Sequence, residues 1–461
     1  MIVNNEESLH SEHYTDARAR SLFWTDEPRE NLPKQEPVPA FACFGSGGSS
    51  VMLWKAMSDT YFQKGFGLKA TVGPALASSY RSSIVEHLKD LGYDAAAGDL
   101  RVKLAREFGF CYGVDRAVEY AYETRAQFPD SRIFLCGEII HNPDVNSRLR
   151  AKGIIILADA KDPVSRFAEV QADDVVILPA FGLTVGEMEH LRAKHCVLVD
   201  TTCGSVLNVW KKVQRCARDG FTVVIHGKHY HEETRATASQ ALMYNGKYLC
   251  LRDVAEAEVV CRFLRGEASA TTLLEKFRDA ASPDFDPARD LQRIGLANQT
   301  TMLMTESLAI QELLRSAVRD RYGNEALEYR FSAFDTICSA TQDRQDAVMA
   351  MLGTGDLDIM VVIGGYNSSN TQALAQMCAS RLPTYHIDAP GCIDGTEIRH
   401  RPVRQYSEVV TGNWLPSGPV TLGLTAGAST PDSVVGDVLD RILALRGKTA
   451  VDLTRHGSYI L

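Results

Sequence analysis

The sequence predicts an α/β protein made of three similar α/β units, related by a weak three-fold repeat. From residue 101 onward, short apolar segments alternate with amphipathic ones, as expected for parallel β–α units. In addition, a strand, a cysteine and a helix recur in that order three times. The length of 461 residues agrees with about three domains at roughly 150 residues each.

The apolar segments define the expected strands and domain limits. Candidate strands lie at 101–106, 132–136, 174–178, 196–200, 221–226, 358–363 and 420–424. The interval 264–290 is polar and contains two prolines, so we expect a loop or insertion there. The expected division is an extension without an assigned role at 1–100, domains at 101–200, 201–335 and 336–440, and a tail at 441–461. Within the extension, 43–50 resembles a linker and 76–93 a helix.

Each repeat places one cysteine between a strand and a helix. Cys111, Cys203 and Cys338 precede expected helices at 113–127, 205–218 and 341–352. Helix N-termini present unpaired N–H groups and a positive dipole end, and both favour a thiolate over a thiol. Three domains around a common axis would bring the thiolates together, as a metal ion or an iron–sulfur cluster requires. The alternative is three unrelated buried cysteines.

The remaining cysteines fit roles in packing. The chain contains eleven cysteines, scattered and without a CxxC pair, so a disulfide framework is not expected in a large cytosolic chain. A free cysteine behaves as a small hydrophobic residue. Those in apolar or helix-like stretches are Cys136, Cys196, Cys216, Cys250 and Cys261.

Charge and hydropathy exclude several classes of protein. The net charge of −9 argues against a protein built to bind nucleic acid, although a local basic pocket could still hold an anionic small molecule. No apolar run reaches about 18 residues, so no membrane span or membrane partner is expected. The first 36 residues are acidic and lack the basic start and apolar core of a secretion signal. We therefore expect a bacterial cytoplasmic location.

Polar motifs at the ends of expected strands suggest a site for an anionic substrate. Strand ends in parallel α/β sheets are where ligands bind, and Gly-rich turns before helices hold phosphate. The motifs are His141-Asn142-Pro143, GKHYHEET at 227–234, NQTT at 298–301, GGYNSSN at 364–370 and TAGASTPD at 425–432. The alternative is that these residues only cap helices or lie on solvated surface.

Together these motifs resemble the 4-hydroxy-3-methylbut-2-enyl diphosphate reductase family, also called LytB. The matching segments follow the family order and cover about residues 101–440: GFCYGVDRA (109–117), HN (141–142), DTTCGSV (200–206), HEET (231–234), NQTT (298–301), DTICSAT (335–341), NSSN (367–370) and TAGASTPD (425–432). The PAFG segment at 179–182, the N-terminal region and the interval 264–290 resemble the cyanobacterial and plant branch.

The resemblance implies a reductive dehydroxylation that yields isopentenyl and dimethylallyl diphosphates, the last step of the non-mevalonate isoprenoid pathway. It implies a pseudo-three-fold trefoil of three α/β domains around one central 4Fe–4S cluster, held by Cys111, Cys203 and Cys338 with the fourth iron open. Glu233 would donate a proton and work with Thr300 near the substrate hydroxyl. The implied substrate-binding residues are His141, Asn142, His231, Thr300, Ser368, Ser369, Asn370 and Ser429.

One residue departs from the family pattern. Many bacterial members carry a third diphosphate-binding histidine where this chain has Phe181, which cannot donate a hydrogen bond. Lys228 or His229 is a candidate to compensate. The resemblance also implies an electron donor, ferredoxin or flavodoxin. No dinucleotide fingerprint follows a strand, so direct use of a nicotinamide cofactor is not expected.

Two other functions agree with parts of the pattern. A hydrolase or transferase for phosphorylated metabolites would use the phosphate motifs and leave the cysteines structural. A cluster- or zinc-binding sensor would keep the three thiolates and would not need Glu233 or the phosphate loops. Colour, dependence on a reductant and diphosphate binding distinguish these alternatives.

Overall fold

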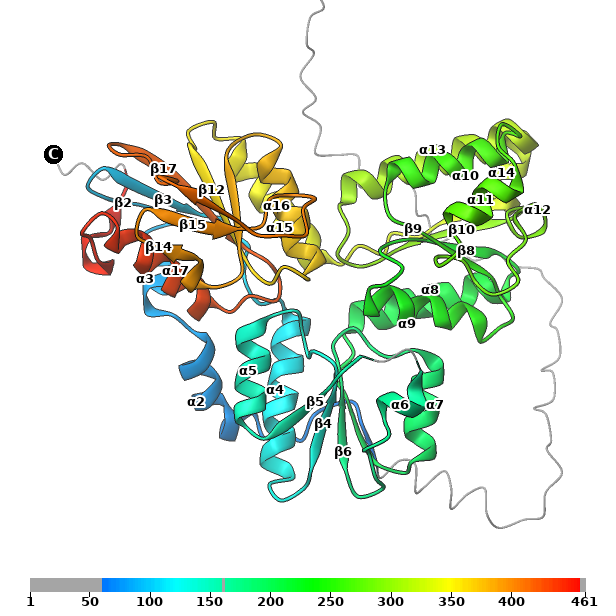
Figure 1. Cartoon of the computed structure of the whole chain (residues 1–461), viewed down its shortest axis with the longest axis horizontal. Coiled ribbons are helices and arrows are strands. Elements are labelled where there is room, and N and C mark those ends of the chain that lie inside the picture. Colours follow the sequence, from blue (N-terminus) through cyan, green and yellow to red (C-terminus); the bar gives the residue numbers. More distant parts are fainter. Residues whose placement is uncertain (1–59, 160–161, 457–461) are drawn as a thin grey trace, which may run out of the picture. The chain divides into compact units, whose positions relative to one another are not determined.

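In the computed structural model, residues 60–159 and 162–456 are described, and the expected linker at 43–50 lies outside them. The described part is an α/β structure with three sheets that contain parallel strands, and the expected fold class is confirmed (Figure 1). The seven strands and the three helices that follow the cysteines are found within a few residues of their expected limits. None of the described helices is long and apolar enough to cross a membrane.

The first sheet is fully parallel and has the order β1-β7-β6-β4-β5. Its strands are rich in Val, Ile and Leu because both faces are covered, by α4 and α5 on one side and by α6 and α7 on the other (Figure 1). The elements are β1 (Tyr61–Phe62), β4 (Ile133–Cys136), β5 (Ile154–Leu157), β6 (Val175–Leu178), β7 (Val197–Asp200), α4 (Tyr112–Gln127), α5 (Pro143–Ala151), α6 (Pro163–Arg166) and α7 (Val185–Ala193).

The second sheet is also parallel, with the order β11-β10-β8-β9. Its core is formed by apolar faces of α8, α9, α10 and α13 packed onto the strands. The elements are β8 (Thr222–His226), β9 (Tyr248–Leu251), β10 (Ile294–Asn298), β11 (Phe331–Ala333), α8 (Gly204–Arg218), α9 (Glu232–Leu242), α10 (Val254–Leu264), α11 (Ala270–Lys276), α12 (Pro287–Asp290), α13 (Met304–Tyr322), η1 (Asn324–Ala326) and α14 (Leu327–Arg330).

The third sheet has the order β13-β12-β17-β3-β2-β18, parallel from β13 to β3 and antiparallel at β2 and β18. Helices α15 and α16 pack on one face, and α3 and α17 on the other. The elements are β2 (Asp94–Ala97), β3 (Leu100–Leu104), β12 (Ile359–Ile363), β13 (Thr384–Ile387), β17 (Val420–Ala426), β18 (Thr454–Arg455), α3 (Ser83–Asp90), α15 (Ser339–Leu352), α16 (Ser369–Ala379), α17 (Asp432–Ala444), η2 (Pro390–Cys392) and η3 (Ala450–Asp452). A small antiparallel sheet of β14 (Ile393–Asp394), β15 (Glu397–His400) and β16 (Val409–Gly412) adjoins it.

The strand before Cys111 does not belong to the first sheet, contrary to the expected domain limit at residue 101. Strand β3 pairs with β17 in the third sheet, whereas α4, which follows Cys111, packs on the first. The same crossing occurs at Cys203, between β7 of the first sheet and α8 of the second, and at Cys338, between β11 of the second and α15 of the third. Each cysteine therefore lies where the chain passes from one sheet to the next. The other domain limits stay predictions.

Residues 60–100, the described part of the expected N-terminal extension without an assigned role, pack into the fold. Strand β1 pairs with β7, α2 (Lys69–Tyr80) lies beside α4, and β2 pairs with β3. The helix expected at 76–93 is two helices, because the chain is extended at Ser82 between α2 and α3. At the other end, the expected tail adds strand β18 to the edge of the third sheet.

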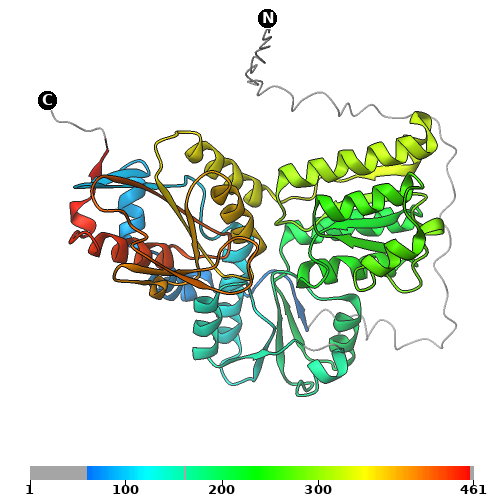
Figure 2. The same ribbon diagram turned by 45° about the horizontal axis from the view of Figure 1, so that its top comes forward.

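The polar composition of the interval 264–290 suggested a loop or insertion, and the structure shows that the interval is not an irregular loop. It contains α11 and α12, and Leu273, Phe277 and Phe285 are buried in the core of the second sheet. Leu273 and Phe277 are spaced by one helical turn, which places both on the buried face. The four-residue spacing of Leu273 and Phe277 could have predicted this helix, whereas the overall composition of the segment could not. Figure 2 shows this region and the three layered units from a second direction.

His386 should make the stability of the fold depend on pH. Its Nε2 lies 2.9 Å from the carbonyl oxygen of Gly364, at the turn after β12. Burial, followed by the charges of Arg401 and His400, lowers its pKa from 6.5 to about 4, partly offset by that hydrogen bond. In the unfolded chain, His386 is therefore protonated below about pH 6.5, whereas in the folded protein it is protonated only below about pH 4. The free energy of unfolding should fall as the pH drops through this range, by about 2 kcal/mol per 1.5 pH units.

Thermal unfolding of the wild type and of His386→Gln between pH 7 and pH 5 measures this effect. The variant keeps an N–H donor for Gly364 but cannot be protonated, so its melting temperature should fall less on acidification. His195→Asn, at an exposed position with positive φ, should keep the wild-type profile. Parallel profiles for the wild type and His386→Gln would show that His386 does not titrate as stated.

Candidate functional site

The side chains expected to form a site lie beyond the carboxyl ends of parallel strands. His141 follows β4, Cys203 follows β7, His231 follows β8, Thr300 follows β10, Cys338 follows β11, Ser368 follows β12 and Ser429 follows β17. Ligands bind at this edge in α/β sheets because the helices that follow the strands point their N-termini there. Hydrogen bonds and ion pairs between these loops, described below, place residues from all three sheets in one site.

The three cysteines occupy the same local position. Cys111, Cys203 and Cys338 are the N-cap residues of α4, α8 and α15, each with an extended backbone. The Sγ atoms of Cys111 and Cys203 lie 3.9 and 2.6 Å from the point that a Cβ on Gly113 would occupy, so only glycine permits their approach. A Cys111 thiolate is also close enough to raise the pKa of Cys338.

Burial dominates the protonation of two of these thiols, those of Cys111 and Cys338. It raises the pKa of Cys111, although backbone N–H groups and Arg344 act in the opposite direction. It raises the pKa of Cys338 to about 11, against the hydrogen bonds that its Sγ makes with the side chain and the backbone N–H of Thr341. The helix N-termini thus act as expected, but in the protein alone they do not outweigh burial. A metal that binds here must displace the thiol protons.

The spacing of the cysteines does not suit a single tetrahedral ion. Such a zinc ion, with Zn–S bonds of about 2.3 Å, needs its sulfurs about 3.8 Å apart. Within the described residues, the groups whose ligand atoms all lie within 4.8 Å of one another do not include these three cysteines. A cluster of several irons separates its thiolate ligands further, so the donor set fits an iron–sulfur cluster.

Glu233 is a fully buried carboxylic acid beside the cysteines. Its two oxygens accept hydrogen bonds from Thr300, from the backbone N at 2.7 Å and from Oγ1 at 3.0 Å. The carbonyl of Thr300 accepts in turn from the backbone N of Cys338 at 3.2 Å. Burial raises the pKa of Glu233 to about 7, although the bonds from Thr300 lower it. A carboxyl with this pKa can hold a proton at neutral pH and deliver it.

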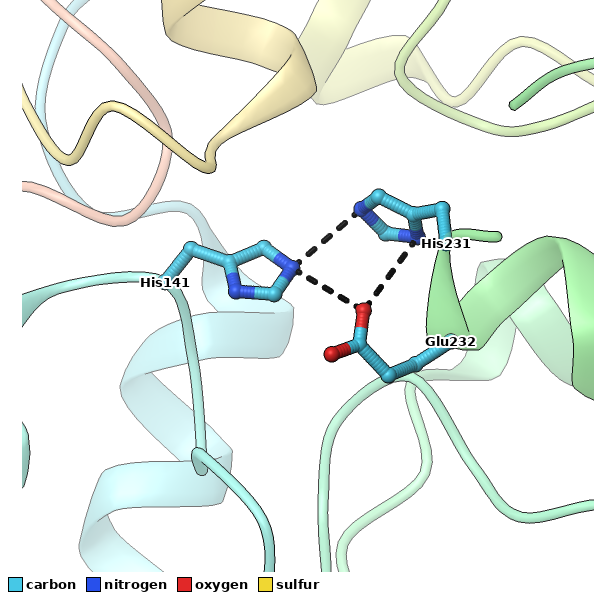
Figure 3. Close-up of side chains that lie close together, drawn as sticks. All are labelled: His141, His231 and Glu232. Atoms are coloured by element: carbon cyan, nitrogen blue, oxygen red, sulfur yellow. Dashed lines mark hydrogen bonds and ion pairs between the residues drawn. The ribbon is translucent and has the colours of Figure 1, made fainter. Parts of the chain in front are cut away.

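His141 and His231 face each other with Glu232 beside them (Figure 3). Their Nε2 atoms are 3.2 Å apart, and an oxygen of Glu232 lies 3.6 Å from Nε2 of His141 and 3.8 Å from Nδ1 of His231. The backbone N–H of Glu233 donates to Nδ1 of His231. This bond assigns the proton of neutral His231 to Nε2, which points at His141. Burial, His141 and Lys228 together lower the pKa of His231.

Phe181 lies inside this histidine group. Its ring stacks on His141 with a centroid separation of 4.3 Å and meets His231 edge to face at 5.6 Å. Nδ1 of His141 lies 2.8 Å from Glu138, so the imidazole is held from its far side as well. Phe181 thus orients the two histidines and offers no hydrogen bond of its own.

The expected hydroxyl and amide residues line the same region. Ser429 Oγ donates to the carbonyl of His141 at 3.2 Å, and Asn370 Oδ1 accepts from the backbone N of Ala428 at 2.9 Å. Asn142 Nδ2 and Ser369 Oγ are buried and have no hydrogen-bond partner among the described residues. Buried polar atoms normally have partners, so these two donors are suited to a polar ligand.

Sequence reasoning did not identify Arg344, which supports the loop of Cys111. This buried guanidinium, on α15, donates to the carbonyls of Phe108, Gly109 and Phe110. It therefore ties the helix that begins at Cys338 to the segment that contains Cys111. No local signal could reveal this role, because an arginine in a helix usually lies on a solvated face.

The fold and the site define an α/β protein with half-buried cysteines at the crossings between its sheets and a cluster of buried polar side chains near them. The family model for LytB protein matches residues 102–443, and the chain belongs to the LytB family.

Relatives named 4-hydroxy-3-methylbut-2-enyl diphosphate reductase match over nearly their whole length. The protein of Cyanothece sp. is 45% identical, with 84% of this chain and 95% of the relative covered. That of Gloeobacter violaceus is 47% identical, with 85% and 94% covered. The solved E-1-hydroxy-2-methyl-but-2-enyl-4-diphosphate reductase from Plasmodium falciparum shares the fold, with a TM-score of 0.55, 20% identity, and coverage of 75% of this chain and 88% of that one. The expected resemblance to the cyanobacterial branch is confirmed.

Proposed function

We propose that this chain catalyses the reductive dehydroxylation of 4-hydroxy-3-methylbut-2-enyl diphosphate to isopentenyl and dimethylallyl diphosphates. The observation that carries the proposal is a buried acid, Glu233, which Thr300 links to Cys338 and which lies two residues after His231 of the histidine pair. The relatives, at 45–47% identity over most of both chains, carry the name of this activity.

Cys111, Cys203 and Cys338 would hold a 4Fe–4S cluster through three thiolates. Such a cluster, when bound, supplies single electrons and a Lewis-acidic iron at the position without a cysteine ligand. The electrons would come from ferredoxin or flavodoxin. The cytoplasmic location stays a prediction.

The protein's own residues bind, orient and protonate the substrate. The donors of Asn142, Ser368, Ser369, Asn370 and Ser429, with the two imidazoles, would hold the diphosphate and fix the alcohol end next to the cysteines. Glu233 would deliver the proton that turns the leaving hydroxide into water, and Thr300 Oγ1 would orient that carboxyl. The reaction takes up two electrons and two protons and releases one water molecule.

Anaerobic purification followed by visible absorption and iron and acid-labile sulfide analysis tests the cofactor. About four irons per chain would support the cysteine site. A colourless protein that resists reconstitution of a cluster would refute the proposal. In that case, the alternative of a phosphometabolite hydrolase or transferase would lead, and activity without reductant would be its signature.

Ser369→Ala should weaken substrate binding and leave stability unchanged. The hydroxyl of Ser369 has no partner in the described protein, so its removal should cost the fold little. If it binds the diphosphate, KM should rise roughly tenfold while kcat changes little. Ser368→Ala is the informative contrast, because Ser368 Oγ caps α16 through the backbone N of Thr371, and its loss should also cost about 1 kcal/mol of stability. An unchanged KM in Ser369→Ala would remove this residue from the binding site.

A further inference from the structure

Lys228 is a half-buried cation without a carboxylate partner. It follows β8, three residues before His231, and its Nζ donates to Oε1 of Gln372 on α16 at 2.5 Å. No carboxylate lies within 4.0 Å of Nζ among the described residues. Burial and then the charge of Arg252 lower its pKa to about 8. A half-buried ammonium whose hydrogen-bond partner is a neutral amide is not compensated by a negative charge, so much of the free-energy cost of its burial remains.

The positive charge of Lys228 acts on the histidine pair. It is close enough to His231 to lower the pKa of that imidazole. Its partner Gln372 lies in the first turn after Ser369, whose buried hydroxyl has no partner. Lys228 thus lies between the histidine loop and the start of α16, the two segments expected to contact the diphosphate.

The expected substrate-binding residues lack a permanent positive charge. They are neutral amides and hydroxyls with two imidazoles, and one of these, His231, resists protonation because it is buried. Glu232 adds a negative charge next to both imidazoles, and Phe181 adds no polar group. A diphosphate bound among these side chains would meet net repulsion unless a nearby cation offsets it.

We infer that Lys228 is a substrate-binding residue whose ammonium leaves Gln372 and pairs with the diphosphate. This inference rests on the proposed function, because it assigns the charge that the substrate of that same site requires. Arg252 is a poorer candidate, because it is already paired with Asp253 and Glu256. His229 is exposed, so of the two residues considered from the sequence only Lys228 is placed for this role.

Binding of inorganic diphosphate to the cluster-loaded protein, measured by calorimetry, tests the inference directly. Lys228→Met should weaken the affinity roughly tenfold to a hundredfold, the usual value of a charge-assisted hydrogen bond. In turnover with the substrate, KM should rise to a similar extent and kcat should stay within about twofold. Lys228→Arg should restore most of the affinity. Lys211→Met, on the exposed face of α8, is the matched control and should bind as the wild type does.

A purely structural role for Lys228 makes a different prediction. If Lys228 only ties β8 to α16, Gln372→Met should impair binding as much as Lys228→Met. If Lys228 binds the diphosphate, Gln372→Met frees the ammonium and should keep the affinity within about twofold. Equal losses in the two variants, or wild-type affinity in Lys228→Met, would overturn the inference. Failure of the proposed function would give a different result: the wild-type protein would bind inorganic diphosphate but would not reduce the substrate.

Discussion

Cys338→Ser should abolish the bound cluster and reduce turnover to background. Cys338 is the N-cap of α15, and its Sγ accepts from the backbone N of Thr341, a role that serine also fills. The fold should therefore survive, whereas a serine hydroxyl is a poor ligand for iron in place of a thiolate. Iron and sulfide content, the visible spectrum and turnover measure the effect, and circular dichroism checks the fold. Cys111→Ser and Cys203→Ser should behave alike, because both occupy the same position in their helices.

Cys261→Ser is the matched control for these variants. Cys261 is buried on α10 in the core of the second sheet, where a serine hydroxyl can bond to a carbonyl one turn earlier. It should keep the full iron content and near-normal turnover. If Cys338→Ser kept four irons and activity, the three-cysteine site would be wrong. A loss of iron in Cys261→Ser as well would point to general instability.

Glu233→Gln should retain the cluster and lose turnover by about 100-fold or more, the contribution expected of a general acid. Glutamine keeps the shape and can still accept a hydrogen bond from Thr300, but it cannot supply the proton. Burial raises the pKa of Glu233 from 4.5 to about 7, so the free energy of unfolding falls as the pH rises from about 4.5 to 7 and stays at the lower value above pH 7. At pH 8 the variant should therefore melt at no lower temperature than the wild type.

Rapid kinetics with a one-electron reductant would separate this defect from a binding defect. Inorganic diphosphate should bind Glu233→Gln as it binds the wild type, and only kcat should fall. Glu258→Gln, on the exposed side of α10, should remain fully active. Near-normal kcat in Glu233→Gln would exclude the assigned proton donor.

Local patterns were sufficient to predict the strands, the α/β class and the position of each cysteine at a helix start. Apolar runs identify buried parallel strands, and the residues around Cys111, Cys203 and Cys338 repeat closely enough to align. The polar motifs after the strands also fall at one edge of the sheets, because the carboxyl ends of parallel strands lie together.

Properties that depend on contacts between distant segments could not be predicted. The assignment of β3 to the third sheet depends on its pairing with β17, more than 300 residues away. The roles of Arg344 and Gln372 arise from contacts between loops and helices of different sheets. Burial also outweighs a local effect at two of the cysteines: it raises the pKa of Cys111 and Cys338, which helix N-termini were expected to lower. These effects follow from the packed structure and leave no local pattern.

The central claim is tested most directly by supplying the anaerobically purified, cluster-loaded protein with 4-hydroxy-3-methylbut-2-enyl diphosphate and a one-electron reductant. The products are then identified and quantified. The account predicts isopentenyl and dimethylallyl diphosphates in amounts equal to the substrate consumed, with two electrons used per product and none formed without reductant. A protein that carries four irons but leaves the substrate unchanged, or that releases free phosphate without reductant, would contradict it.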